Sequence, residues 1–399
     1  TQIGLGNAYV NRIRGNQAEN LEEAITCYQN VLTIYTQQDF PTQWAMTQEY
    51  LGNAYVNRIR GDQAQNLEDA IACYQNALTI WTRENFPTEW ANAQMNLGIA
   101  YQNRIDGDHV QNLEDAIAYF QNALTIYTQQ DFPTQWAMTQ INLGNAYNQA
   151  FDIISIRGDK AQNLEEAITC YQNALTIYTQ QDFPTNWAKT QMNLGVAYES
   201  RIQGDKAQNL EDAIAYFQNA LTIYTQQDFP TDWAMTQVNL GNAYRYRIQG
   251  DQAQNLEKAI TCYRNALTIY TRHDFPTDWA KTQMNLGNAY RERLRGKQAE
   301  NLEEAITCFQ NALTIETPET NPSNCLKAAA NLGNLAFTQG NWHLTIDSYQ
   351  TALATIEQLR NWASNDQRRQ EILKSMIDIY GNLIHAYVQT QQYGKALEI

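Results

Sequence analysis

The spacing of apolar residues along the chain predicts pairs of amphipathic helices. Residues 86–131 show the pattern once, as two apolar stripes with a helical period of about 3.6 residues. The first stripe consists of Trp90, Ala93, Leu97, Ala100, Tyr101 and Ile105, and the second of Leu113, Ala116, Ile117, Phe120, Ala123, Leu124 and Tyr127. We expect Thr88 to cap the first helix, and Asn112 to cap the second in a capping box with Asp115. Gly107 is expected to end the first helix in a left-handed conformation, so the unit is a helical hairpin.

This unit is repeated along the whole chain. A Leu-Gly pair marks it, with glycines at Gly6, Gly52, Gly98, Gly144, Gly195, Gly241, Gly287 and Gly333, spaced by 46 residues except for one interval of 51. A glycine inside a helix costs about 1 kcal/mol relative to alanine, so its recurrence predicts a close approach of the partner helix. Neither helix of a hairpin can cover its apolar face alone, so the hairpins must stack. The predicted fold class is an all-α superhelical solenoid of stacked antiparallel hairpins.

Composition and charge exclude several classes of function. The net charge of −15 argues against a nucleic-acid partner, because a phosphate backbone needs a concentrated basic surface. No apolar run reaches the roughly 18 residues of a membrane span, so we expect no membrane partner. The sequence contains neither the phosphate-binding loop motif nor the dinucleotide-binding motif, and we expect no cofactor.

The cysteines and histidines do not form a recognisable reactive site. Cys27, Cys73, Cys170, Cys262 and Cys308 occupy the same place in successive units, where Tyr119 and Tyr216 stand in two others. A position that accepts both residue types is a packing position, and unpaired cysteines fit a reducing, cytoplasmic compartment. The four histidines, His109, His273, His343 and His385, lie in different units without a shared context. We therefore predict no metal site and no enzymatic activity.

The order Leu-Gly-x-Ala-Tyr, followed by Ala-Ile-x-x-(Tyr/Phe)-x-x-Ala-Leu, resembles the tetratricopeptide repeat (TPR). The match is plainest in residues 332–353, "LGNLAFTQGNWHLTIDSYQTAL", which have the spacing of an ordinary repeat of about 34 residues. The earlier units are longer, and we expect the additional residues to lengthen both helices. Such long units resemble those of bacterial multidomain proteins, including TPR arrays joined to CHAT-type proteases, and those of kinesin light chain. We expect seven long units in residues 1–317, the first truncated, and more ordinary units in residues 318–399, the last incomplete.

The resemblance implies that the first helices line a concave surface that binds a peptide. Family members that bind extended peptides hold the backbone with the asparagine after the Leu-Gly pair. The matching residues are Asn7, Asn53, Asn145, Asn242, Asn288 and Asn334, and the pattern is broken by Ile99 and Val196. Residues that differ between units on this face are expected to supply selectivity, namely Glu199, Arg245, Tyr246, Lys281 and Arg291.

A structural role is the alternative for the recurring polar residues. The asparagines after the Leu-Gly pair can instead bridge neighbouring helices, and this alternative stays open. Bridging is the favoured interpretation for the asparagines before the pair, Asn96, Asn142, Asn193, Asn239, Asn285 and Asn331. The recurring arginines are expected to pair with carboxylates or to cover aromatic rings; they are Arg58, Arg104, Arg201, Arg247 and Arg293.

The tripeptide Arg60-Gly61-Asp62, repeated at residues 157–159, resembles an integrin-adhesion motif. The equivalent positions of other units read RGN, DGD, QGD and RGK, so only the glycine is constant. An aspartate after glycine is typical of a turn, because its side chain bonds nearby backbone N–H groups. We therefore predict that the tripeptide is a turn between two helices rather than an adhesion site.

Two functions remain. The first is a protein–protein interaction scaffold that binds a protein or peptide segment in the groove of the first helices. The second is a regulatory or sensor arm of a larger effector, such as a CHAT-type protease or a nucleotide-driven switch, whose effector domain lies outside this chain.

Overall fold

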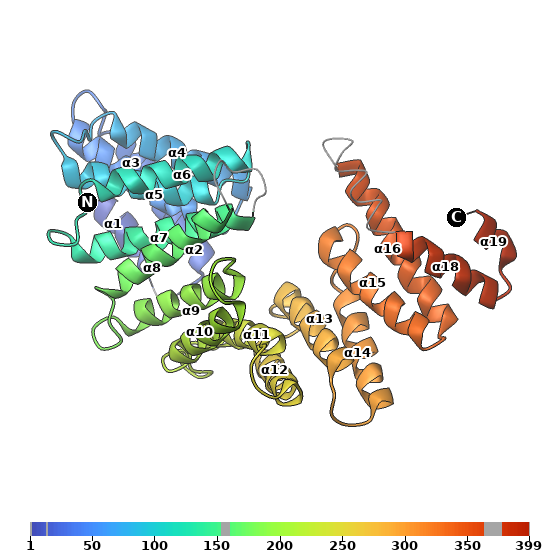
Figure 1. Cartoon of the computed structure of the whole chain (residues 1–399). Coiled ribbons are helices and arrows are strands. Elements are labelled where there is room, and N and C mark those ends of the chain that lie inside the picture. Colours follow the sequence, from blue (N-terminus) through green and yellow to red (C-terminus); the bar gives the residue numbers. More distant parts are fainter. Residues whose placement is uncertain (1, 13–14, 153–159, 363–376, 399) are drawn as a thin grey trace. The chain divides into compact units, whose positions relative to one another are not determined.

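The computed structural model describes residues 2–12, 15–152, 160–362 and 377–398, which contain helices and connections but no strand. None of the helices in these ranges combines the length and the apolar character of a membrane span. The chain divides into two compact units, residues 1–206 (unit 1) and 207–399 (unit 2), and each is described by itself (Figure 1).

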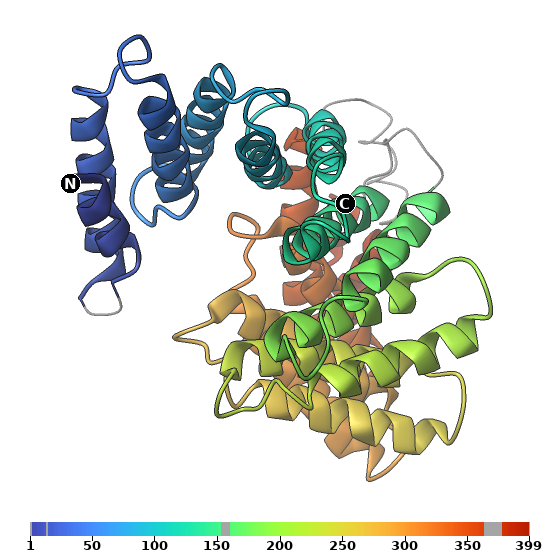
Figure 2. The ribbon, with the colours of Figure 1, turned by 90° about the vertical axis from the view of Figure 1, so that its left-hand side faces the viewer.

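The helices of unit 1 form successive hairpins. They are α1 (Gln2–Val10), α2 (Gln17–Leu32), α3 (Pro41–Val56), α4 (Gln63–Leu78), α5 (Pro87–Gln102), α6 (His109–Leu124), α7 (Pro133–Asp152), α8 (Lys160–Leu175) and α9 (Pro184–Ser200). Helices α1, α3, α5 and α7 each pack against the second helix of their own hairpin. Each of them also contacts the first helix of the next hairpin, from α1 through α3, α5 and α7 to α9. Figure 2 shows these hairpins following one another from the blue N-terminal end.

Unit 2 repeats the arrangement. Its helices are α10 (Lys206–Ala220), α11 (Pro230–Tyr246), α12 (Gln252–Ala266), α13 (Pro276–Glu292), α14 (Gln298–Leu313), α15 (Pro322–Thr338), α16 (Trp342–Trp362), α18 (Ile377–Gln389) and α19 (Tyr393–Leu397). Helices α11 and α12, α13 and α14, and α15 and α16 pack as hairpins, and α11 contacts α13. The predicted class, an all-α solenoid of stacked antiparallel hairpins, is confirmed. The predicted boundary between long and ordinary repeats at residue 317 stays a prediction.

In the hairpins that begin with α1, α3, α5, α7, α11, α13 and α15, the glycine inside the first helix lets an aromatic ring of the second helix approach its backbone. A Cβ atom on Gly98 would lie 2.5 Å from Cε1 of Phe120, and one on Gly144 would lie 2.7 Å from Cε1 of Tyr171. Both rings are buried. Equivalent contacts exist at Gly6, Gly52, Gly241, Gly287 and Gly333. The predicted close approach is therefore confirmed.

The second helix of the hairpin begins about one turn earlier than predicted. Helix α6 starts at His109, and its N-cap is Asp108, whose carboxylate accepts hydrogen bonds from two backbone N–H groups. Asn112, the expected cap, is buried inside the helix. Its Nδ2 donates to the carbonyl of Asp106 at 2.9 Å, and its Oδ1 accepts from Arg104 at 3.4 Å. Asn112 therefore closes the preceding turn instead of capping the helix.

The first helix is shorter than predicted. Helix α5 begins at Pro87 with no side-chain cap, so Thr88 is not its N-cap. It ends at Gln102, and Ile105, which was predicted to be buried, is 61% exposed. Gly107 does have a left-handed φ of +87°, but it lies in the turn beyond the helix. After the repeat glycine, α5 continues for four residues and α15 for five, so the additional residues in this part of the long unit do not lengthen the first helix.

A recurring ion pair joins neighbouring hairpins. Just after α5, Arg104 donates through Nε and Nη2 to the two carboxylate oxygens of Glu68 on α4, at 2.6 and 2.9 Å. The guanidinium also lies 5.3 Å from the ring centroid of Tyr101. The other copies are Arg58–Glu22, Arg201–Glu165, Arg247–Glu211 and Arg293–Glu257. The predicted pairing of these arginines is confirmed.

The Arg-Gly-Asp stretch is a turn in the part that the structure describes. Gly61 has a φ of +86°, and Asp62 caps α4 by accepting from two backbone N–H groups. Arg60 lies 3.6 Å from Glu19. The structural interpretation is confirmed for residues 60–62, whereas the copy at residues 157–159 lies outside the described residues.

The recurring cysteines are packing residues, as predicted. All six cysteines are buried free thiols. Burial raises the pKa of Cys73 to about 12, so this thiol remains protonated and unreactive at neutral pH.

Candidate functional site

The predicted peptide-binding asparagines occupy equivalent places on the first helices. In unit 1, Asn53 lies on α3 and Asn145 on α7; in unit 2, Asn242, Asn288 and Asn334 lie on α11, α13 and α15. Each directly follows the buried glycine and is at least partly exposed. The repeat therefore presents one carboxamide at the same place in each of these hairpins.

The Oδ1 atom of most of these asparagines accepts a hydrogen bond from a tyrosine hydroxyl of the same hairpin. The hydroxyl of Tyr74 donates to Asn53 at 2.8 Å, and that of Tyr171 to Asn145 at 2.9 Å. The bond recurs in the pairs Tyr28–Asn7, Tyr263–Asn242 and Tyr349–Asn334, at 2.6, 2.8 and 2.6 Å. Burial raises the pKa of Tyr74, so its hydroxyl stays protonated and continues to donate. These asparagines thus have a structural role, which leaves mainly Nδ2 for a ligand.

The two breaks in the asparagine pattern follow this pairing. The ring against Gly98 is Phe120, which has no hydroxyl to donate, and the residue after the glycine is Ile99. The sequence shows the same exchange at Val196 and Phe217. An asparagine therefore accompanies a tyrosine, and an apolar residue accompanies a phenylalanine.

Asn288 is an exception to this rule. The ring against Gly287 is Phe309, so no hydroxyl is present for Asn288. Its Oδ1 instead accepts from Nδ2 of Asn331 on α15, at 3.4 Å. A carboxamide can therefore stand at this position above a phenylalanine.

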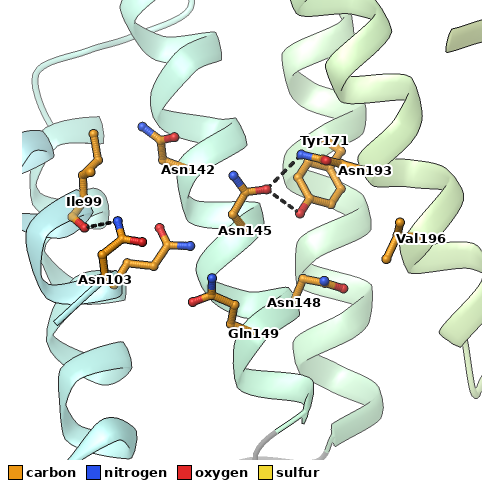
Figure 3. Close-up of a pocket in the computed structure, with 10 residues that line it drawn as sticks. Ile99, Asn103, Asn142, Asn145, Asn148, Gln149, Tyr171, Asn193 and Val196 are labelled. Carbon is orange, nitrogen blue, oxygen red and sulfur yellow. Dashed lines mark hydrogen bonds between the residues drawn. The ribbon is translucent and has the colours of Figure 1, made fainter. Parts of the chain in front are cut away.

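A pocket of about 380 Å³ lies over α5, α7 and α9 of unit 1 (Figure 3). Its walls contain Tyr171, the apolar side chains of Ile99 and Val196, and seven carboxamides. The carboxamides are Gln102, Asn103, Asn142, Asn145, Asn148, Gln149 and Asn193. None of these lining residues is charged, although the chain as a whole has a net charge of −15. The pocket thus offers hydrogen bonds without an ionic partner.

Asn145 lies between the two apolar walls of the pocket, with Ile99 on the α5 side and Val196 on the α9 side (Figure 3). Its Oδ1 accepts both from Tyr171 and from Nδ2 of Asn193, each at 2.9 Å. The second bond joins α7 to α9. Asn193 thus has the bridging role that we predicted for the asparagines before the Leu-Gly pair, and Asn96 and Asn331 also bridge to the preceding first helix.

Three carboxamides of α7 are open to a ligand. Over the described ranges of the chain, the side chains of Asn142, Asn148 and Gln149 form no hydrogen bond. Asn148 and Gln149 lie about one turn past Asn145, towards the end of α7, which has 20 residues where α5 has 16. Each carboxamide offers two donors and one acceptor oxygen. This part of α7 therefore contributes hydrogen-bonding groups to the pocket, as the equivalent residues Gln102 and Asn103 do at the end of α5.

Two of the charged residues predicted to supply selectivity in unit 2, Arg245 and Arg291, pair with Glu292. Arg245 donates to both carboxylate oxygens of Glu292, at 2.7 and 2.9 Å, and to the hydroxyl of Tyr246 at 3.1 Å. Arg291 lies 3.6 Å from Glu292. Burial is the largest single influence and raises the pKa of Glu292, but the hydrogen bonds and charges of Arg245 and Arg291 together outweigh it and hold this pKa below its ordinary value. Lys281 is exposed, about three turns earlier on α13.

Sequence reasoning missed some residues of the pocket. Gln102, Asn103 and Gln149 were not singled out, although they lie four or five residues after the repeat glycines. They therefore lie three or four residues after the position that follows the Leu-Gly pair, about one turn on and on the same helix face as Ile99 and Asn145, which could have identified them. Within the described residues, no group of three histidine, cysteine, aspartate or glutamate side chains could hold a metal ion.

Fold and site together define the class of protein. The chain is a TPR-type helical-repeat protein whose first helices carry the candidate site. The model of the family "Soluble NSF attachment protein, SNAP" matches residues 138–244 and 232–367, which together exceed half of the 399 residues. The chain therefore belongs to this family.

Solved structures share the fold at low sequence identity. The apo form of RapI has a TM-score of 0.51 at 14% identity, and the comparison covers 79% of this chain and 99% of RapI. A Rap protein complexed with competence and sporulation factor has a TM-score of 0.53 at 11% identity, with 99% and 95% of the two chains covered. No curated protein matches the sequence significantly.

Proposed function

We propose that the chain is a protein-interaction scaffold that binds an extended segment of a partner across its first helices. The main support for this proposal is the uncharged pocket of unit 1, in which Asn142, Asn148 and Gln149 have carboxamides without a hydrogen-bond partner among the described residues. An extended segment exposes backbone N–H and C=O groups that need partners, and a carboxamide serves both kinds. The pocket would bind the segment chiefly through its backbone.

Two further findings support this proposal. A structural neighbour, the Rap protein, was solved in complex with a factor, competence and sporulation factor. The buried free thiols fit the predicted reducing, cytoplasmic compartment. Roles for Asn53, Asn242, Asn288 and Asn334 as further backbone contacts, and a role of the chain as a sensor arm of an effector, stay predictions.

The test should leave the hairpins intact. Asn145→Ala would unpair the buried hydroxyl of Tyr171, which confuses lost binding with lost stability. The double variant Asn148→Ala/Gln149→Ala avoids this problem. Its matched control is Gln130→Ala/Gln181→Ala, which removes two exposed carboxamides from connections between hairpins.

The probe is an array of uncharged peptides with blocked ends, and affinities of the best binders are measured by fluorescence anisotropy with the full chain. Two lost hydrogen bonds should weaken binding by about 5- to 100-fold, while the control variant binds like the parent. Absence of any binding peptide, or equal binding by the pocket variant, contradicts the proposed function.

A further inference from the structure

The apolar walls of the pocket are not required by the hairpin itself. Ile99 stands where most hairpins have asparagine, above Phe120. Packing against phenylalanine does not exclude asparagine, because Asn288 occupies the same position above Phe309. Ile99 and Val196 are also the residues that line the pocket on either side of Asn145 (Figure 3). Their apolar character therefore points to a ligand.

The spacing of the two walls limits what this ligand can be. Ile99, Asn145 and Val196 lie on α5, α7 and α9, and each of these helices contacts the next. Packed helices lie about 8–10 Å apart, so the two walls are separated by roughly 16–20 Å. At about 3.3 Å per residue, an extended chain covers that distance in about five or six residues. Side chains of an extended chain that point to the same surface are an even number of residues apart. Two side chains that reach both walls are therefore about six residues apart.

The chemistry between the walls also limits the ligand. Every lining residue between Ile99 and Val196 is uncharged, and most are carboxamides. A charged side chain entering the pocket would lose hydration without gaining an ionic partner. Apolar side chains, by contrast, gain by covering the two walls.

We infer that this pocket selects an extended, uncharged peptide segment that carries two apolar side chains about six residues apart. One apolar side chain contacts Ile99 and the other Val196, while the backbone between them meets Asn145 and the open carboxamides of α7. The inference rests on the proposed function and adds a sequence preference to it.

Three uncharged peptides with blocked ends test the spacing. The first carries two leucines at positions i and i+6, the second at i and i+5, and the third has glutamine at both places of the first. The i+5 peptide presents one leucine to the opposite side of the extended chain. Titration calorimetry with the full chain should show that the i+6 peptide binds about tenfold more tightly than either of the others.

Ile99→Asn and Val196→Asn test the two walls. Each should abolish most of the preference for the i+6 peptide while leaving the glutamine peptide unaffected, and Asn288 indicates that the hairpin accommodates this residue. The matched control is Met138→Asn on α7, a side chain that is 39% exposed and does not line the pocket. It should keep the preference.

The outcomes separate the inference from the proposed function. If peptides bind through Asn148 and Gln149 but the i+5 and i+6 peptides bind equally, the spacing inference is wrong and the scaffold proposal stands. If Ile99→Asn and Met138→Asn change the preference for the i+6 peptide equally, the inference is also wrong. If no peptide binds, both are wrong.

Discussion

Alanine at position 98 tests whether the repeat glycine is fixed by packing. Helix propensity alone would stabilise Gly98→Ala by about 1 kcal/mol. The added Cβ, however, would lie 2.5, 2.7 and 2.8 Å from three ring atoms of Phe120, which is fully buried and has no space to move towards solvent. Such overpacking costs about 1–3 kcal/mol, and a clash with three atoms belongs at the upper end. We therefore expect a net loss of about 2 kcal/mol in the free energy of unfolding.

The measurement is urea unfolding followed by circular dichroism, with the denaturant slopes compared as well as the midpoints. The matched control is Gly381→Ala on α18, where nothing beyond the adjoining backbone of the same helix lies within 4 Å of the added Cβ, and this variant should gain about 1 kcal/mol. Combining Gly98→Ala with Phe120→Leu should cost less than the sum of the two single changes, because the smaller side chain makes room. A gain in stability by Gly98→Ala, or simple additivity in the double variant, would refute the reasoning.

Three further predictions concern helix caps and titrating carboxylates. Asp62 caps α4, so Asp62→Ala should destabilise the chain by about 1 kcal/mol. Lys297 stands at the N-cap of α14 without a side-chain cap, so Lys297→Asp should stabilise the chain by about 1 kcal/mol. Urea unfolding of both variants checks this. The hydrogen bond from Arg58 lowers the pKa of Glu22 in the folded protein. The ion pair therefore stabilises the fold at pH values above the ordinary pKa of glutamate, and this stabilisation is lost as the pH falls through the lowered pKa of Glu22. Glu22→Gln should therefore cost about 0.5–1 kcal/mol near pH 7 and nothing near pH 2, and an equal cost at both pH values would contradict it. Burial raises the pKa of Glu49 from 4.5 to about 7, so the stability of the parent should fall as the pH rises through this range, on the order of 3 kcal/mol. Glu49→Gln should remove that fall, and parallel pH curves for the two proteins would count against it.

The sequence was sufficient for the hairpins because apolar periodicity reports burial directly. The stripe through Phe120, the close approach at Gly98 and the pairing of Arg104 were all predicted correctly. The helix start was not, because Asp108 and Asn112 are both good capping residues. Only the three-dimensional turn shows that the side chain of Asn112 is hydrogen-bonded to the carbonyl of Asp106 and to Arg104.

The candidate site was harder to predict because its contacts join residues far apart in the sequence. Tyr171 is 26 residues from Asn145, and the bond between them depends on how the two helices of a hairpin pack. One signal was nevertheless present in the sequence. Ile99 accompanies Phe120 where Asn53 accompanies Tyr74, and comparing these positions across units would have revealed the pairing.

The two interpretations of the repeat asparagine are compatible, and this changes where ligand choice is expected. A bond to tyrosine uses Oδ1 in the same way in Asn53 and Asn145, so two hairpins that both carry this asparagine offer a ligand the same group here. The position three residues later varies instead, from Asn148 in unit 1 to Arg245 in unit 2. We therefore expect the asparagines to contact the backbone of any bound segment in the same way. The position three residues later, about one turn on, is expected to determine which segment each unit binds.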